Sequence, residues 1–460
     1  MGTDLTMHDT TPGDRVGRNV IFVWEKFGFD QSPYTTEPVP ATEEGDQLLV
    51  GREAEITKLE SRIVSGGTHP TLEGDNGVGK TSLLRVACYR LRRAFEEDSS
   101  AKLFIPIDEF FQPDSDGSVD DFIKRVYWTI ASAIVKEHAT LKEHLDNVPD
   151  ITDIRTWLNS PVLKSGGGSV SVAGFGGGAS VGRVINTGAG FADAGFKELI
   201  DTWLRQMFPS TRAGGFICVI DNLELLETTQ SARNLLEAIR DPLLNRRGLR
   251  WILCGARGII RTSVSSPRLE GRLKDPVEIT PISDEFVAAA IKQRIEICRM
   301  HSQAEPPVGP ETFRYLYDIL NRNLRSAFKI AEDFSFWLLD EGEVSGNAAT
   351  YAELFEVWLT GQADKHHGDT HLRNRAWQVF DTLAERDGWC SPGDYADFGF
   401  NSTAAMRLQV KALEQDNLVV TSINDDADKR RKTISMTPRG WLVRYARTGY
   451  PPPAPRTSAP

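Results

Sequence analysis

The sequence predicts an α/β fold in three parts: a core with a parallel sheet, an all-helical lid, and a small C-terminal winged helix. Three observations support this division. Short apolar runs alternate with amphipathic helical stretches up to residue 282, residues 283–360 carry only helical patterns, and residues 371–447 combine helical patterns with one hairpin pattern. Strands that alternate with helices are typical of a parallel sheet covered by helices on its faces.

Five apolar runs are the expected strands of the core. Each is short, rich in aliphatic or aromatic residues, and followed by a turn or a helical pattern. They are "HPTLEGD" at 69–75, "KLFIPIDEF" at 102–110, "FICVID" at 216–221, "LRWILCGAR" at 249–257 and "DPVEITPI" at 275–282.

Composition sets the remaining boundaries. We expect disordered ends at 1–18 and 448–460, which are rich in Pro, Thr, Ser and Gly. A polar linker is expected at 361–370, because the histidines in and beside it lack the spacing of a metal site. Within the core, which spans 19–282, the glycine-rich insertion at 164–190 is either a mobile loop or a β-hairpin wedge.

Charge and cysteine usage narrow the functional classes. The 460-residue chain has a formal net charge of −11, so any DNA contact must come from a local patch. Its 5 cysteines form no CxxC pair, which is typical of reduced thiols in a cytoplasmic protein and not of a zinc site. No apolar run reaches membrane-spanning length. We therefore expect a soluble cytoplasmic protein with no membrane partner.

The stretch "EGDNGVGKTS" at 73–82 is the most specific motif. It fits GxxxxGK[ST], in which glycines let backbone N–H groups turn toward phosphate oxygens and the next helix directs its N-terminus at the same charge. A strand pattern precedes it and a helix pattern follows it, as this P-loop motif requires. The predicted phosphate-binding residues are Gly74, Asp75, Asn76, Gly77, Val78, Gly79, Lys80, Thr81 and Ser82.

A metal site is expected beside the phosphates. Lys80 would reach the β- and γ-phosphates, and the Thr81 hydroxyl would ligate Mg²⁺. The second metal-binding residue is Asp221, which ends the apolar strand "FICVID" as the downstream signature of a P-loop protein requires.

Three downstream residues bear on hydrolysis. Many ATPases of this class place Glu after the metal-binding Asp, but here Asn222 can orient a water without taking its proton. Glu224 is a candidate replacement base. Arg257 follows the next strand and would sense the γ-phosphate, unless it is a solvated loop arginine. Slow hydrolysis is therefore expected, which suits a switch better than a motor.

These motifs resemble those of AAA+ ATPases of the initiator branch, the origin-recognition and loader proteins, and more loosely those of STAND NTPases. The resemblance covers residues 45–447. "LVGREAEI" at 49–56 looks like the motif that opens such modules. It implies that Val50, Gly51 and Arg52 line the adenine pocket of bound ATP.

Two further segments carry the resemblance into the lid. "SSPRLEGRLKDPVEITPISDEF" is similar to the segment that carries an arginine finger, which implies Arg272, with Arg268 second. An arginine finger acts in trans, on the nucleotide of a neighbouring molecule, and therefore implies self-association. "NRNLRSAFKIAEDF" resembles the sensor-2 helix, which implies that Arg325 lies over the nucleotide. The resemblance implies ATP and Mg²⁺ as cofactors, and Asn222 departs from it at the usual acid.

The C-terminal part is similar to a winged helix of the MarR kind. Its third helix, "AAMRLQVKALEQ", would be capped by "NST" and would bury Met406, Val410 and Leu413 on one face. Residues 371–447 hold 12 Lys and Arg against 10 Asp and Glu, a net charge of +2. The residues expected to contact double-stranded DNA are Arg407 and Lys411 of the helix and Lys429, Arg430, Arg431 and Lys432 of the wing.

Two functions fit these features. The first is an ATP-gated factor that assembles into oligomers and binds duplex DNA through the winged helix. The second is a STAND-like regulator, for instance in antiviral defence, whose winged helix and insertion contact an effector protein. A third option is a transcriptional regulator with a vestigial ATPase module, but the intact phosphate-binding motif disfavours it.

Overall fold

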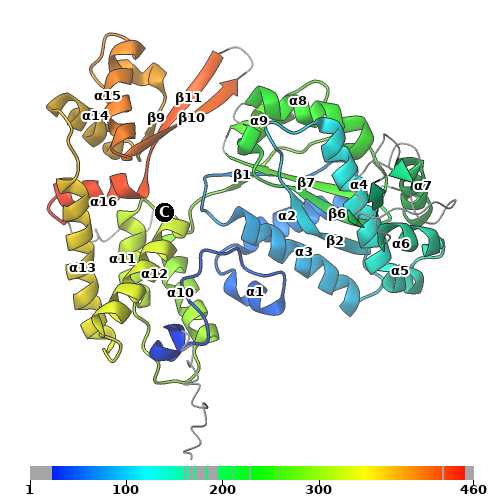
Figure 1. Ribbon diagram of the computed structural model, residues 1–460, viewed down its shortest axis with the longest axis horizontal. Helices are drawn as coiled ribbons and strands as arrows, with labels where there is room; N and C mark the ends of the chain where they lie inside the picture. The colour runs from blue at the N-terminus through cyan, green and yellow to red at the C-terminus, as the bar shows by residue number, and fades with distance from the viewer. Residues whose placement is uncertain are drawn as a thin grey trace, which may run out of the picture.

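The computed structural model describes residues 23–159, 162–164, 170–171, 183–184, 195–210, 212–226, 229–256, 258–426 and 429–450. The predicted disordered segment 1–18, most of the insertion, residues 451–460 and Arg257 lie outside these ranges. Figure 1 shows the α/β core on one side and the lid and the C-terminal module together on the other.

A five-stranded parallel sheet forms the centre of the core, in the order β2-β6-β7-β1-β8. The predicted α/β class with a parallel sheet is confirmed. All 6 residues of β6 are buried, and they alternate between two hydrophobic clusters on opposite faces of the sheet. The strands are β1 (Thr71–Gly74), β2 (Phe104–Phe111), β6 (Gly215–Ile220), β7 (Leu249–Gly255) and β8 (Val277–Ile279).

Helices cover both faces of this sheet (Figure 1). The helices of one face are α2 (Glu53–Ser65) and α3 (Lys80–Glu97), and those of the other include α4 (Val119–Lys136), α7 (Phe196–Met207) and α8 (Thr229–Ile239). Shorter helical segments are α1 (Glu43–Leu48), α5 (His138–His144), α6 (Thr152–Asn159), η2 (Leu223–Leu226), η3 (Arg240–Leu244) and α9 (Ile259–Val264).

The described residues of the insertion and its flank form a small antiparallel sheet in the order β4-β3-β5. Its strands are β3 (Val162–Lys164), β4 (Val170–Ser171) and β5 (Arg183–Val184). This pairing favours the β-hairpin alternative over an unstructured loop.

The lid is all-helical, as predicted, but it also includes N-terminal residues that the predicted boundary at 19 assigned to the core. The segment η1 (Val23–Phe27), Phe29 and Tyr34 belong to the hydrophobic cluster of the lid. This boundary was wrong because an aromatic run shows that a segment is buried, but not in which of two cores. The lid helices are α10 (Asp284–Cys298), α11 (Pro310–Ile319), α12 (Leu324–Glu341) and α13 (Ala348–Gly368).

The predicted linker at 361–370 is mostly helix. α13 continues to Gly368, and Ala363 is fully buried in the cluster of the lid. The polar composition was misleading because one small apolar residue is enough to pack this last part of the helix against its neighbour.

The C-terminal module contains α14 (Asn374–Glu385), η4 (Pro392–Ala396) and α15 (Thr403–Gln415), followed by the hairpin of the wing and α16 (Pro438–Arg447). Met406, Val410 and Leu413 are buried, as predicted for α15, and Ser402 is its N-cap. The three-stranded sheet has the order β10-β11-β9, with β9 (Trp389–Cys390), β10 (Val419–Asp426) and β11 (Lys429–Met436).

α16 joins this module to the lid. Leu442 and Tyr445 belong to the hydrophobic cluster of the lid, whereas Val443 belongs to that of the module. The Tyr445 hydroxyl is hydrogen-bonded to the Tyr315 hydroxyl of α11 at 2.5 Å. Because one helix contributes to both cores, the lid and the module are expected to move as one body.

Candidate functional site

The phosphate-binding motif adopts a tight loop between β1 and α3. Gly77 and Gly79 have φ values of +86° and +98°, which only glycine adopts without strain. α3 begins at Lys80, so its N-terminus points into the loop. The buried Lys80 Nζ donates to the carbonyl oxygens of Gly74 at 2.9 Å and Asp75 at 3.1 Å. The sequence therefore forms a concave set of backbone donors with one cation at its centre.

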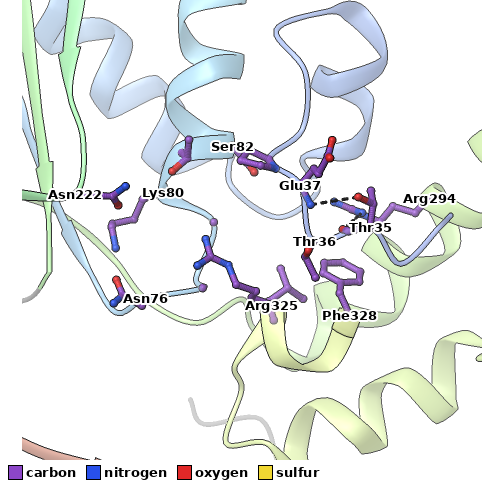
Figure 2. Close-up of a pocket in the computed structure, with 15 residues that line it drawn as sticks. Thr35, Thr36, Glu37, Asn76, Lys80, Ser82, Asn222, Arg294, Arg325 and Phe328 are labelled. Atoms are coloured by element: carbon purple, nitrogen blue, oxygen red, sulfur yellow. Dashed lines mark hydrogen bonds between the residues drawn. The ribbon is translucent and has the colours of Figure 1, made fainter. Parts of the chain in front are cut away.

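A pocket lies beside this loop, between the core and the lid. In the view of Figure 2, Lys80 and Asn222 lie at one end, Phe328 and Arg294 lie at the other, and Arg325 lies between them. The core contributes residues 76–77, 79–82 and 222, and the lid contributes residues 294, 324, 325 and 328.

The metal-binding pair predicted from the sequence comes together at the Lys80 end. The Thr81 hydroxyl donates to Asp221 Oδ2 at 2.9 Å, and the backbone N–H of Asn222 donates to Asp221 Oδ1 at 2.9 Å. Asp221 is 2% exposed. Burial, with the nearby Asp221 carboxylate, raises the pKa of the Cys254 thiol, which therefore stays protonated. Among the described residues, no cluster of three or more His, Cys, Asp or Glu could hold a metal.

Asn222 and Glu224 are placed differently. Asn222 lines the cavity with φ +57°, a left-handed conformation that Asn adopts more readily than Glu. Glu224 is not among the lining residues, and its Oε2 accepts a hydrogen bond from the backbone N–H of Ala256 at 3.0 Å. Glu224 thus holds the end of β7 in place, which disfavours the interpretation of this carboxylate as a general base.

The lid presents two arginines to the cavity. Arg325, the predicted sensor-2 residue, lies in the first turn of α12 and lines the cavity. It lies close to the loop, since a Cβ added to Gly77 would be 3.0 Å from the Arg325 Cβ. Asn323 caps the same helix and donates to the carbonyl oxygen of Asn76 at 3.2 Å. The second arginine, Arg294 of α10, is 8% exposed, and its guanidinium lies 4.3 Å from the Phe328 ring centroid. Desolvation lowers the pKa of Arg294 to about 10, so it remains a cation at neutral pH.

Sequence reasoning missed a segment that we call the strap, residues 35–38. The strap lines the cavity and is held by both neighbouring parts. Arg294 of the lid donates to the carbonyl oxygen of Thr35 at 3.3 Å, and Arg85 of α3 donates to that of Pro38 at 3.2 Å. On the lid side Tyr34 is fully buried, and on the core side Val39 is 4% exposed. No motif marks the strap, and "YTTEPVP" shows only that the chain is extended there.

Val50, Gly51 and Arg52 are not among the residues that line the cavity, contrary to the expectation that they form its adenine end. Gly51, with φ +76°, allows Phe286 of the lid to approach, since a Cβ there would lie 2.6 Å from that ring. Arg52 is buried behind the phosphate-binding loop. The motif lies at the joint between core and lid, whereas the strap lines the cavity.

Arg268 and Arg272, the candidate arginine fingers for a neighbouring subunit, do not line the cavity of their own chain. Arg257 lies outside the described residues. Arg272 is exposed, and Arg268 is exposed and pairs with Glu237 at 3.4 Å. Both lie on the surface of the core between α9 and β8, where they are open to a neighbouring molecule.

The predicted DNA-binding residues lie on two elements. Arg407 and Lys411 are exposed on α15, away from its buried residues. In the register of the wing hairpin, Asp426 lies opposite Lys429 and Asp425 lies opposite Arg430, while Asn424 and Ile423 lie opposite Arg431 and Lys432. Acidic positions therefore face two of the four cationic positions.

No family model and no curated protein matches the sequence. Among solved structures, the chain is similar to the ORC1 protein of Aeropyrum pernix in complex with DNA, at 14% identity and a TM-score of 0.43, covering 91% of this chain and 97% of that one. It is also similar to the ORC2 protein of Aeropyrum pernix in ADPNP–ADP complexes (12%, TM-score 0.42, 86% and 93%). A third is Cdc6p of Pyrobaculum aerophilum (14%, TM-score 0.37, 91% and 98%). At this level of similarity, the function must be argued from the geometry of this chain.

In the described part of the chain, no helix combines the length and apolarity needed to cross a bilayer.

Proposed function

We propose that this protein is a nucleotide-dependent switch that binds ATP with Mg²⁺ between its core and its lid and contacts double-stranded DNA through its winged helix. One observation carries the proposal: the phosphate-binding loop of the core and the N-terminus of α12 in the lid converge on one cavity. A phosphorylated ligand there would touch both parts at once, so its phosphate state would bias the angle between them.

The charges of the cavity suit a triphosphate. Lys80, Arg325 and Arg294 contribute three cations from its two sides, against Glu37 as the acidic lining residue. Lys80 would exchange its two carbonyl contacts for β- and γ-phosphate oxygens, and the N–H groups of residues 77–81 would donate to the same oxygens. The strap, Phe328 and Arg294 would enclose the base at the far end.

The donor set at the Lys80 end fits Mg²⁺, because a hydroxyl and a carboxylate are the hard oxygen ligands that this ion prefers. Thr81 and Asp221 would hold it, and it would neutralise phosphate charge there. Asn222, which lines the cavity, would orient water but cannot accept its proton, and the Glu224 carboxylate is hydrogen-bonded to Ala256. We therefore propose slow hydrolysis.

The shared helix α16 supports the step from nucleotide to DNA. Because Leu442 and Tyr445 pack in the lid while Val443 packs in the winged helix, a rotation of the lid would carry the winged helix with it. The exposed Arg407 and Lys411 would then change their position relative to the core. This coupling would make DNA affinity depend on the bound nucleotide.

Fluorescence anisotropy of duplex binding tests the proposal. The affinity is measured with no nucleotide, with ADP and with a non-hydrolysable ATP analogue. We expect the analogue to tighten binding and Lys80→Ala to abolish that effect. Equal DNA affinity in all three conditions would contradict the proposal that the bound nucleotide controls DNA binding. Failure of the wild type to retain adenine nucleotide with Mg²⁺ in equilibrium dialysis would overturn the switch itself.

A second candidate is a regulator whose winged helix contacts an effector protein. Leu408 is 70% exposed between Arg407 and Lys411, and Trp389 is 58% exposed on β9. Large exposed apolar side chains favour a protein contact more than a phosphate contact. Assembly in trans through Arg272 or Arg268 fits either candidate. Size-exclusion chromatography with ATP and with duplex DNA separates them, because ATP-driven assembly that ignores DNA favours the regulator.

A further inference from the structure

We propose that Arg52 is a positioning residue that braces the phosphate-binding loop from outside the cavity, an inference that rests on the proposed nucleotide-binding function. Arg52 directly precedes α2, and its side chain is 6% exposed. Its Nη2 donates to the carbonyl oxygen of Val78 at 3.0 Å, and its Nη1 pairs with Glu55 at 2.9 Å. It therefore contacts the loop on the side away from the cavity, because Arg52 and Val78 are not among the lining residues.

The contact matters because of the neighbours of Val78. Gly77 and Gly79 both have positive φ, and glycine has little conformational preference of its own, so these residues do not fix the peptide plane between Val78 and Gly79. In a planar trans peptide, the C=O and N–H bonds point in opposite directions. By holding the Val78 carbonyl outward, Arg52 directs the Gly79 N–H to the opposite side. Gly79 lines the cavity, so its N–H is one of the donors offered to a phosphate.

The chemistry requires arginine at this position. The planar guanidinium reaches Glu55 with one nitrogen and Val78 with another, so the ion pair fixes the orientation of the hydrogen bond. Lysine offers a single nitrogen and cannot hold both partners in this geometry. The substitution Arg52→Lys should therefore keep the charge that neutralises Glu55 but release the loop.

The experiment compares three ligands by calorimetric titration in the presence of Mg²⁺: ATP, GTP and inorganic tripolyphosphate, which has no base. For a brace, Arg52→Lys weakens all three by the same factor, about 10–100-fold, the size expected when a hydrogen bond to a charged group is lost. If Arg52 instead contacts the base, the variant changes the ratio of ATP to GTP affinity and leaves tripolyphosphate unchanged. That result overturns the proposal.

Arg62→Lys is the matched control. Arg62 lies on the same helix and also donates to a backbone carbonyl, that of Asp275 at 2.5 Å, at a site outside the cavity lining. This variant should bind all three ligands as the wild type does. Hydrogen exchange gives a second measurement without ligand: amides of residues 77–80 should exchange faster in Arg52→Lys, and unchanged exchange contradicts the brace. If the wild type binds none of the ligands, the proposed function fails before the role of Arg52 is reached.

Discussion

The cavity and the wing hairpin differ in how many parts of the chain specify them. The cavity is lined by five segments distant in sequence: the strap, the phosphate-binding loop, the turn after β6 and two lid helices. Two of its lining cations, Lys80 and Arg294, are buried and donate hydrogen bonds to backbone carbonyl groups. The wing is one local hairpin, and its cationic positions follow one another on β11.

This difference predicts two kinds of response to mutation. A buried, multiply supported site loses most of its function when one central residue is removed, because the remaining groups are arranged around it. A local charged surface loses function gradually, because each cation adds a similar increment that salt screens.

The largest effect is expected for Lys80→Ala. The variant removes the one Lys among the described residues that line the cavity, and the other positive charges described there belong to the lid. We therefore expect ATP affinity to fall at least about 100-fold, or roughly 3 kcal/mol. Equilibrium dialysis with Mg²⁺ measures it. DNA binding without nucleotide should stay within about twofold of the wild type. A loss of less than about tenfold would show that the loop is not the centre of the site.

A smaller effect is expected when the wing is reversed in charge, with Lys429, Arg430, Arg431 and Lys432 all changed to Glu. Duplex affinity should fall about 10–100-fold near 0.1 M salt, and the salt dependence should become shallower as phosphate contacts are lost. Anisotropy across a salt series measures both. Nucleotide affinity should not change. The control reverses the charge of two exposed lid residues, Arg314 and Lys329. An equal loss of duplex affinity in that control would mean that net charge, and not contact by the wing, determines the affinity.

The next test concerns a buried histidine just before β1, the strand that leads into the phosphate-binding loop. His69 precedes β1, its Nε2 lies 2.7 Å from the Leu244 carbonyl oxygen, and its Nδ1 accepts from the Trp251 N–H. Burial lowers its pKa to about 4, below the ordinary value of 6.5. The unfolded chain therefore binds the extra proton first, and stability is lost as pH falls from 6.5 toward 4.

We expect the free energy of unfolding to fall by about 2 kcal/mol between pH 7 and pH 5 from this group alone. Chemical denaturation followed through tryptophan fluorescence measures it. In His69→Gln the same pH change should have a smaller effect, whatever the absolute stability of the variant. An identical pH slope in both proteins would contradict the assignment.

The smallest effect, a slower hydrolysis of ATP, is expected for substitutions of Asn222. Its φ of +57° makes Asn222→Ala strained by about 1 kcal/mol, whereas Asn222→Gly removes the amide without that strain. Single-turnover hydrolysis of ATP in both variants separates the two contributions. Equal slowing in both assigns the effect to the lost amide, and slowing in Asn222→Ala alone assigns it to the backbone.

The sequence predicted what is encoded in contiguous motifs and missed what the fold assembles. Local sequence patterns were enough to predict the strands and the loop from Gly74 to Thr81. The pairing of Thr81 with Asp221 was also predictable, because both residues follow strands of the same parallel sheet. The strap and Arg294 were not, since their position depends on how the lid folds back over the core. Arg52 was recognised as part of a motif, but only its hydrogen bond to Val78 reveals which side of the loop it contacts.

The strap also limits how far the protein can open. Its neighbour Tyr34 is buried in the lid and its neighbour Val39 is buried in the core, so the five peptide units between them connect the two parts directly. Fully extended, they span no more than roughly 18 Å, at about 3.6 Å per residue. The two anchor points cannot separate beyond that length, whatever the conformation of residues 280–283, which connect β8 to α10. The opening through which a ligand enters and leaves the cavity is therefore limited in width.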